Sequence, residues 1–258
     1  TLMAQDYHIL VTDTDANALS FGSELICING VCMCKPEPQC CIGLCHADIV
    51  DPPPADCAGL PCSEYKVPQG CDAALGAGKV NDPLGNPCGV DSGKRYLLDS
   101  QQDLTETFSC VAKVGAGGDG NETPMAAMLE ALGPLNQAGE CNEGFLRDDA
   151  ILVVTFITDE DDDPKKSMGD PATWKQALVD LKGGNEEAIV VLGLIGDPDV
   201  PGGLCGVQDA QASPRLRTFA ESFTHGQWGS VCAPDYAPFF AEAVSVIDTA
   251  CDDFSPPG

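Results

Sequence analysis

The chain has 258 residues, enough for one large domain or two modest ones, and its hydrophobic content of 43% is that of a globular protein. Its formal net charge of −27 argues against nucleic acid or an anionic membrane surface as a partner, because both would repel it. Fifteen cysteines are far too many for a reducing cytosol, so we expect a secreted or cell-surface protein. No apolar run approaches the roughly 20 residues that span a bilayer, and no signal peptide is visible, which predicts a mature form.

The first regular element is predicted at residues 7–12 (YHILVT), which read as a buried strand. This strand ends in carboxylates, of which Asp13 is the first. His8 lies inside the strand and is expected to be a satisfied core or edge histidine rather than a metal ligand, because no second histidine is near in sequence.

Residues 17–93 are predicted to be a disulfide-stapled, irregular insertion. Prolines cluster here and no helical or strand periodicity persists, so cross-links rather than burial should hold the segment. A zinc site at Cys40, Cys41, Cys45 and His46 is a weaker alternative, because the spacing matches no standard pattern. The even number of cysteines allows five disulfides of unknown connectivity among Cys27, Cys32, Cys34, Cys40, Cys41, Cys45, Cys57, Cys62, Cys71 and Cys88.

Strands and amphipathic helices alternate from residue 94 to the end of the chain. Strands are predicted at residues 94–98, 151–157, 188–195 and 228–231. This alternation predicts an α/β domain with a doubly wound, mostly parallel sheet and helices on both faces, formed by residues 1–16 and 94–258. The helical core stripes are Leu104, Phe108 and Val111; Met125, Met128, Leu129 and Leu132; Trp174, Ala177, Leu178 and Leu181; Leu216, Phe219, Ala220 and Phe223; and Phe240, Ala243, Val244 and Ile247.

An acidic run, Asp159 to Asp163, follows the strand at residues 151–157 directly. The strand shows no alternation of apolar and polar residues, so we expect it to be buried on both faces. Open α/β sheets bind ligands at the carboxyl ends of their strands, and clustered carboxylates favour Ca²⁺ or Mg²⁺. Asp161 and Asp13 are therefore candidate ligands of a divalent cation, and a solvated acidic loop is the alternative.

A glycine-rich segment, residues 115–123, leads into a helix that Thr123 and Pro124 open. It lacks the Gly-Lys-Ser/Thr ending of a phosphate-binding loop, and Asp119 and Glu122 would repel an anion, so a cation suits it better. The same segment contains a glycosylation sequon at Asn121, a pattern that is frequent by chance.

Thr123-Pro124 opening a helix, followed by a buried strand that ends in Thr158-Asp159, resembles the second and third loops of a von Willebrand factor A domain. The resemblance implies that Thr123 and Asp159 help to bind Mg²⁺ or Ca²⁺. Residues 141–163, 212–223 and 229–244 are similar to a group of secreted, cysteine-rich bacterial proteins with such domains. The similarity covers about residues 5–15 and 94–254. It implies a fold and a metal site but says little about the biological role of the protein.

One part of the family pattern is absent from this sequence. The family's first loop, Asp-x-Ser-x-Ser, follows a central strand and supplies three further ligands, and no such motif occurs here. A gap at a central strand would leave unpaired backbone groups. Three explanations are open: an N-terminal fragment of the same precursor that stays associated, a strand donated by another chain, or a sequence that starts downstream of that strand.

The remaining cysteines are Cys110, Cys141, Cys205, Cys232 and Cys251. Cys205 and Cys232 each follow a predicted parallel strand, so both belong near the same end of the sheet, and we predict a disulfide between them. The total number of cysteines is odd, so one thiol should be free or should pair outside the chain.

These observations favour a non-enzymatic adhesion or protein-binding module with a divalent-cation site at the carboxyl end of the sheet. The runner-up is a structural subunit of an extracellular assembly, completed by strand donation. A metal-assisted hydrolase is less favoured, because the sequence has no G-x-S-x-G or H-E-x-x-H motif and only three dispersed histidines, His8, His46 and His225.

Overall fold

The computed structural model describes residues 6–14, 25–28, 31–34, 56–57, 60–61, 70–83, 85–114 and 122–255. The chain forms two compact units. The first unit comprises Thr1–Met3, Asn121–Gly133 and Leu146–Gly258, and the second comprises Ala4–Gly120 and Pro134–Phe145. These bounds differ from the predicted domains, because residues 94–120 and 134–145 belong with the second unit rather than with the sheet.

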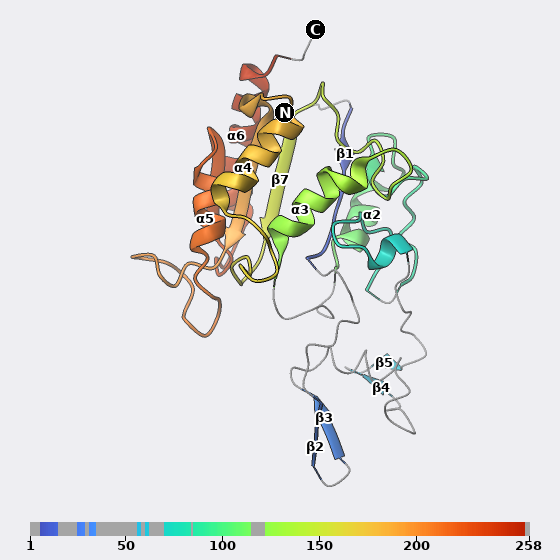
Figure 1. The fold of residues 1–258 in the computed structure, drawn as a ribbon, viewed down its shortest axis with the longest axis vertical. Coiled ribbons are helices and arrows are strands. Elements are labelled where there is room, and N and C mark those ends of the chain that lie inside the picture. The colour runs from blue at the N-terminus through green and yellow to red at the C-terminus, as the bar shows by residue number, and fades with distance from the viewer. Residues whose placement is uncertain are drawn as a thin grey trace. The chain divides into compact units, whose positions relative to one another are not determined.

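A three-stranded parallel sheet in the order β7–β8–β9 is the centre of the first unit (Figure 1). Its strands are Leu152–Ile157 (β7), Ile189–Ile195 (β8) and His225–Ser230 (β9). Parallel neighbours need crossover connections, and the helices α4 (Pro171–Leu181) and α5 (Pro214–Glu221) lie in them. The predicted α/β class with parallel strands is therefore confirmed for this unit.

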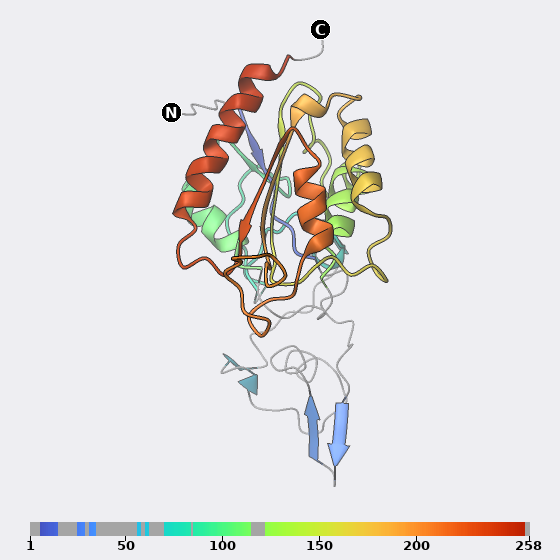
Figure 2. The ribbon, with the colours of Figure 1, turned by 90° about the vertical axis from the view of Figure 1, so that its left-hand side faces the viewer.

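Helices cover both faces of this sheet, as Figure 2 shows with α6 on one side and α4 and α5 on the other. On the α5 side, Phe156 of β7 packs against Phe219, with 6.3 Å between ring centroids. On the other side, Val190 and Leu192 of β8 form a buried cluster with Ala243 of α6 (Ala237–Asp253). The helix α3 (Pro124–Leu132) packs beside α4, and the 3-10 turn η4 (Glu186–Ala188) precedes β8.

The two neighbouring apolar strands differ in burial. All seven residues of β8 are buried, and its glycine, Gly193, leaves room for the ring of Phe156, which a Cβ would approach to 2.7 Å. The prediction that β7 is buried on both faces is wrong, because Val153 and Ile157 are 39% and 58% exposed. The reason is that α6 packs on β8 and β9, and no strand within the described ranges pairs with the other edge of β7.

Two predicted helical stripes are also only partly buried. Phe240 and Val244 of α6 are 41% and 45% exposed, whereas the small residues Ala243 and Ala250 are buried against the sheet. Phe108 of α2 (Leu104–Val111) is 42% exposed. In α6, Phe239, Val246 and Ile247 pack against the same cluster as the two alanines, so the face toward the sheet only partly coincides with the predicted stripe.

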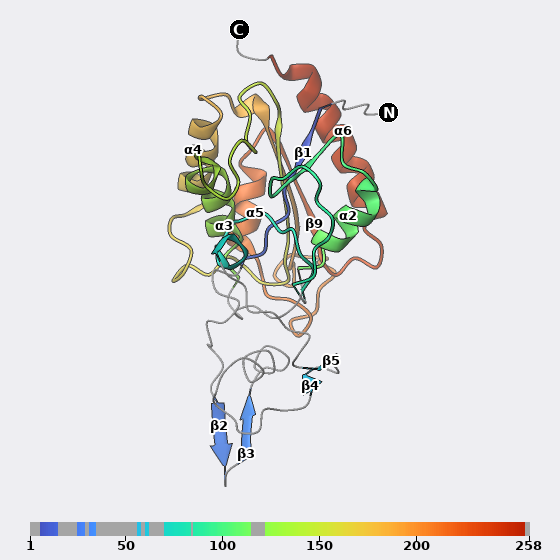
Figure 3. The same cartoon turned by 90° about the vertical axis from the view of Figure 1, so that its right-hand side faces the viewer.

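The second unit has short elements (Figure 3). The strand β1 (His8–Ile9) pairs antiparallel with β6 (Leu97–Leu98), and α2 follows β6. His8 donates from Nδ1 to the Phe145 carbonyl at 2.9 Å, which confirms the expected satisfied histidine. The other elements are the antiparallel pairs β2 (Leu25–Ile28) with β3 (Val31–Cys34) and β4 (Asp56–Cys57) with β5 (Leu60–Pro61), and the 3-10 turns η2 (Gly70–Ala73) and η3 (Pro134–Asn136).

Two disulfides hold the described part of the second unit, Cys71–Cys141 and Cys88–Cys110. Both connect residues 17–93 to later segments, so five disulfides cannot all lie within the predicted insertion. The reason is that cysteine counting does not determine connectivity. The side chains of the other eight predicted disulfide cysteines of the insertion lie outside what the structure describes, and so does their pairing.

Candidate functional site

Two carboxylates of the acidic run after β7 cap the amino ends of two helices. Both carboxylate oxygens of Asp161 accept backbone N–H groups at the start of α5, from Arg215 and Leu216, each at 3.1 Å. Asp162, which is 1% exposed, accepts the backbone N–H of Met125 in the first turn of α3 at 3.0 Å. The first N–H groups of a helix have no partner inside the helix, so these carboxylates satisfy groups that would otherwise be unpaired.

Capping from a distance matters here because the helices do not cap themselves. The N-cap side chains of α3 and α5, Thr123 and Ser213, make no capping hydrogen bond. Burial raises the pKa of Asp162, against the opposing effects of the Met125 N–H and of Arg215, whose Nη2 lies 3.4 Å away. The loop after β7 therefore fixes the starts of both helices at the carboxyl end of the sheet.

The other carboxylates of this loop form an electronegative patch. Asp163 donates its backbone N–H to the Glu122 carbonyl at 2.9 Å, which joins the loop to the segment before α3. Burial raises the pKa of Glu160, and the nearby negative charges of Glu122, Asp159 and Asp163 raise it further. Because these carboxylates repel one another, a bound cation would relieve the repulsion.

The four predicted metal ligands do not all have the same environment. Thr123, which is 6% exposed, and Asp159 belong to the two joined segments of the first unit. Asp161 belongs to the same loop, but its carboxylate caps α5. Asp13 belongs to the second unit, where its carboxylate accepts a hydrogen bond from Lys79 Nζ at 2.7 Å. The hydrogen bond between Asp163 and Glu122 thus joins the two segments that contain Thr123 and Asp159.

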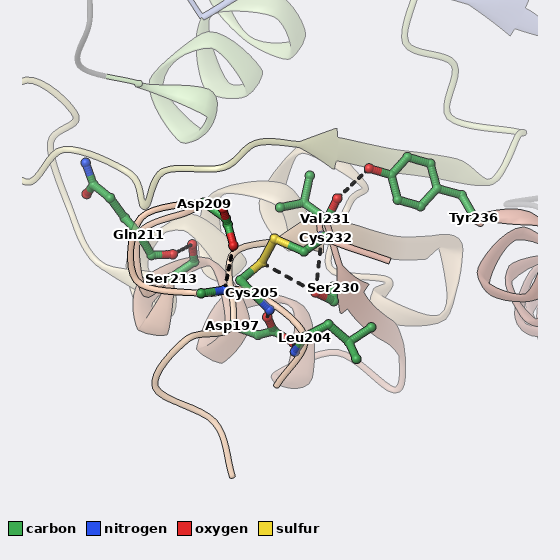
Figure 4. Close-up of a disulfide and its surroundings, with 11 residues drawn as sticks. Asp197, Leu204, Cys205, Asp209, Gln211, Ser213, Ser230, Val231, Cys232 and Tyr236 are labelled. Carbon is green, nitrogen blue, oxygen red and sulfur yellow. Dashed lines mark hydrogen bonds between the residues drawn. A yellow bond between two sulfur atoms is a disulfide. The ribbon is translucent and has the colours of Figure 1, made fainter. Parts of the chain in front are cut away.

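A second loop at this end of the sheet, residues 196–213, follows β8 and is held by polar and covalent links (Figure 4). The predicted disulfide Cys205–Cys232 is confirmed, with 5.2 Å between the Cα atoms. Asp197 is 4% exposed and accepts the backbone N–H groups of Leu204 and Cys205 at 3.0 and 2.8 Å. Burial alone would raise the pKa of Asp197, but these hydrogen bonds outweigh it and lower the pKa. The loop is thereby anchored to the sheet at residues 204 and 205.

Large apolar side chains at this end of the sheet are exposed. Met168 follows β7 and is 87% exposed, while Leu204 and Val207 follow β8 and are 59% and 77% exposed. The carboxyl ends of parallel strands meet at one edge of the sheet, so these loops share that edge. Exposed apolar residues on a fixed loop are typical of a surface that binds another protein.

A different cluster lies at the opposite, amino end of the strands. His225 begins β9, Glu187 lies in η4 just before β8, and Asp253 ends α6. One ligand atom from each of these side chains lies within 4.8 Å of the other two, so the cluster could hold a metal ion. Sequence reasoning missed it, because the predicted strand at residues 228–231 left out His225, which the structure pairs with Val190 of β8.

Comparison with known proteins adds no identity. No protein-family model, no curated protein and no solved structure matches this chain. Within the described ranges, no helix has both the length and the apolar character that a membrane span needs. The three disulfides of the described residues are consistent with an oxidising or extracellular location.

Proposed function

We propose that this chain is a non-enzymatic, extracellular protein-binding module of the von Willebrand factor A type, which binds its partner at the carboxyl end of the sheet. The observation that carries the proposal is the exposed pair Leu204 and Val207 on a loop fixed by Cys205–Cys232 and Asp197. A fixed loop loses little conformational entropy on binding, so its apolar tip contributes more affinity than a mobile one. The chain's net charge of −27 favours a partner with basic residues around an apolar centre.

A divalent cation, Mg²⁺ or Ca²⁺, is proposed beside this surface. Thr123 and Asp159 are the proposed ligands, with Glu122 and Glu160 close enough to add negative charge. Hard oxygen ligands in such a cluster suit Mg²⁺ or Ca²⁺ better than softer metals. Asp161 and Asp13 are weaker candidates, because backbone N–H groups and Lys79 engage their carboxylates.

The binding surface can be tested with peptides selected from a displayed library on the intact, oxidised chain. We expect the double variant Leu204→Ser/Val207→Ser to weaken binding of the selected peptides by at least about tenfold, since it removes two apolar contacts of roughly 1 kcal/mol or more each. Val244→Ser, at an exposed position of α6, is the matched control and should leave binding unchanged. Equal affinity of the double variant and the control would contradict the proposed surface.

A second candidate is a subunit of an extracellular assembly, and the free edge of β7 favours it. Thr158 donates its backbone N–H to Leu194, so the alternate residues Val153, Thr155 and Ile157 direct their backbone groups away from β8. No strand among the described residues pairs with that edge. An extended strand from another chain would satisfy these groups.

Strand addition predicts self-association that depends on concentration and on Thr155. Because the Thr155 N–H faces away from β8, Thr155→Pro keeps the existing sheet and blocks a new strand. We expect sedimentation velocity to show oligomers of the wild type at high concentration and monomers of the proline variant, with Thr155→Ser as control. A monomeric wild type at all concentrations would remove this candidate.

A metal-assisted hydrolase is a weaker alternative. A hydrolytic activity of the wild type that Asp159→Asn abolishes would support it.

A further inference from the structure

Three elements of the first unit bring ionisable side chains together at the amino end of the sheet. His225 Nε2 lies 2.9 Å from Glu187 Oε2 and 3.8 Å from Asp253 Oδ2. The His225 side chain is 5% exposed, while those of Glu187 and Asp253 are 46% and 54% exposed. A buried imidazole thus directs one nitrogen at two carboxylates that solvent and ions can reach.

The backbone holds these three side chains in place. His225 is paired in the sheet with Val190, and Glu187 lies in η4, where its backbone N–H donates to the Asn185 side chain at 3.1 Å. Asp253 is the last residue of α6, and that helix packs against β8 and β9 through Ala250. The cluster therefore depends on regular structure rather than on a loop, which favours a defined geometry.

The electrostatics at this end of α6 favour a cation. The carboxyl end of a helix carries a partial negative charge, which carboxylates there increase. Asp248, Asp252 and Asp253 lie in the last turns of α6, and no basic residue does. The ammonium group of Lys175 is already bound to Glu186 at 2.8 Å and to the Ser222 carbonyl.

We propose that Glu187, His225 and Asp253 bind a zinc ion. An imidazole nitrogen with two carboxylates suits Zn²⁺, whereas Mg²⁺ and Ca²⁺ prefer oxygen ligands alone. Zinc bonds to these atoms at about 2.0–2.2 Å, so tetrahedral ligand atoms lie about 3.3 Å apart. The 2.9 and 3.8 Å separations bracket that value, so small rotations of the two exposed carboxylates complete the site. Three protein ligands leave the fourth position to water.

Zinc at this position would join α6 to β9 and to the turn before β8. The site lies at the end of the strands opposite the proposed binding surface, so it stands or falls independently of that surface. Because a metal that binds only the folded state stabilises it, zinc should raise the melting temperature and slow hydrogen exchange at the end of α6. It should not require the residues of the acidic run after β7.

The test uses the oxidised full chain in a Cys251→Ser background, so that the described free thiol, two residues from Asp253, cannot bind the metal. Isothermal titration with Zn²⁺ after chelator treatment should reveal a site whose affinity falls at least about tenfold in Asp253→Asn and in Glu187→Gln, since even outer-sphere changes commonly cost 10–100-fold. Asp252→Asn, at the neighbouring exposed position, is the matched control and should retain the affinity. Both ligand variants alter exposed carboxylates, so they should fold even where His225→Gln does not.

Cobalt substitution identifies the ligand type. Co²⁺ in this site should show tetrahedral ligand-field absorption without the charge-transfer band of a thiolate, and His225→Gln should abolish it. Absence of zinc binding would overturn the proposal. So would Asp253→Asn and Asp252→Asn with equal affinities, or a thiolate band that assigns the metal to cysteines elsewhere.

Discussion

The two units of this chain are held together in different ways. The first unit contains a fully apolar strand whose seven residues are all buried, since β8 packs between α5 and α6. The second unit, in its described part, has strands of two to four residues and two disulfides. A unit with so little regular structure cannot gain enough from apolar burial, so covalent links that restrict the unfolded chain take that role.

Polar contacts supplement the disulfides of the second unit. The buried Asn142 accepts the Gly78 N–H at 2.9 Å and donates to the Gly76 carbonyl at 2.9 Å. Arg95 donates to the Gly78 carbonyl and forms an ion pair with Asp72. These hydrogen bonds fix the segment around Gly76 and Gly78, which has no helix or strand of its own. Asn142, which holds it, directly follows Cys141 of the disulfide. One chain thus combines a unit stabilised by apolar burial with a unit stabilised by disulfides and polar contacts.

The largest expected effect comes from removing a disulfide of the second unit. Removing the Cys71–Cys141 disulfide by Cys71→Ser/Cys141→Ser frees a separation of 70 residues, which costs about 4 kcal/mol of unfolding free energy in the chain-entropy estimate. Hydrogen exchange measured by mass spectrometry should show rapid exchange in the second unit and unchanged protection of β8. Cys251→Ser, at the exposed free thiol, is the control. Loss of β8 protection in the double variant would show that the units do not unfold separately.

The next largest effect comes from a cavity in the core of the first unit. Leu194 of β8 is fully buried, so Leu194→Ala should lower the unfolding free energy by about 3 kcal/mol through lost burial and a cavity. Ile157→Ala in β7, where the side chain is 58% exposed, should cost less than about 1 kcal/mol. Urea denaturation followed by tryptophan fluorescence would report both. Equal losses at the two positions would mean that β7 is covered in solution.

The smallest expected effect concerns Asp197, a polar anchor inside the first unit. Asp197→Asn removes the charge that accepts the Leu204 and Cys205 N–H groups and should cost about 1–2 kcal/mol at neutral pH. The pKa of Asp197 is lowered on folding from its ordinary value of 3.8, so its contribution is present above that pH and is lost as the pH falls through the folded pKa. The stability difference between wild type and variant should therefore shrink below about pH 3.8. A constant difference down to strong acid would contradict the assigned role.

Sequence reasoning predicted the parts of the first unit that local pattern determines. The apolar run at residues 188–195 predicted β8, and the positions of Cys205 and Cys232 after parallel strands predicted their disulfide. The same pattern overestimated the burial of β7, because burial also depends on which strand is covered by α6. An apolar run identifies a strand, but its neighbours determine how much of it is buried.

The candidate sites could not be assembled from the sequence alone, because their contacts depend on the fold. The acidic run is visible in the sequence, but only the fold assigns Asp161 and Asp162 to the starts of two helices. The Glu187–His225–Asp253 cluster joins residues far apart in sequence, and the end of α6 had to be placed before Asp253 could be included. The partner of Cys71 was likewise inaccessible to counting.

The Cys205–Cys232 disulfide has a mechanical consequence. A force that pulls on the two ends of the chain passes through the sulfur–sulfur bond, so α5 and β9, which lie between the two cysteines, are outside the load path. The 27-residue separation withholds roughly 90 Å of extension, at about 3.3–3.6 Å per residue. Stretching the chain therefore cannot extend the helix and strand between the two cysteines while this disulfide is intact.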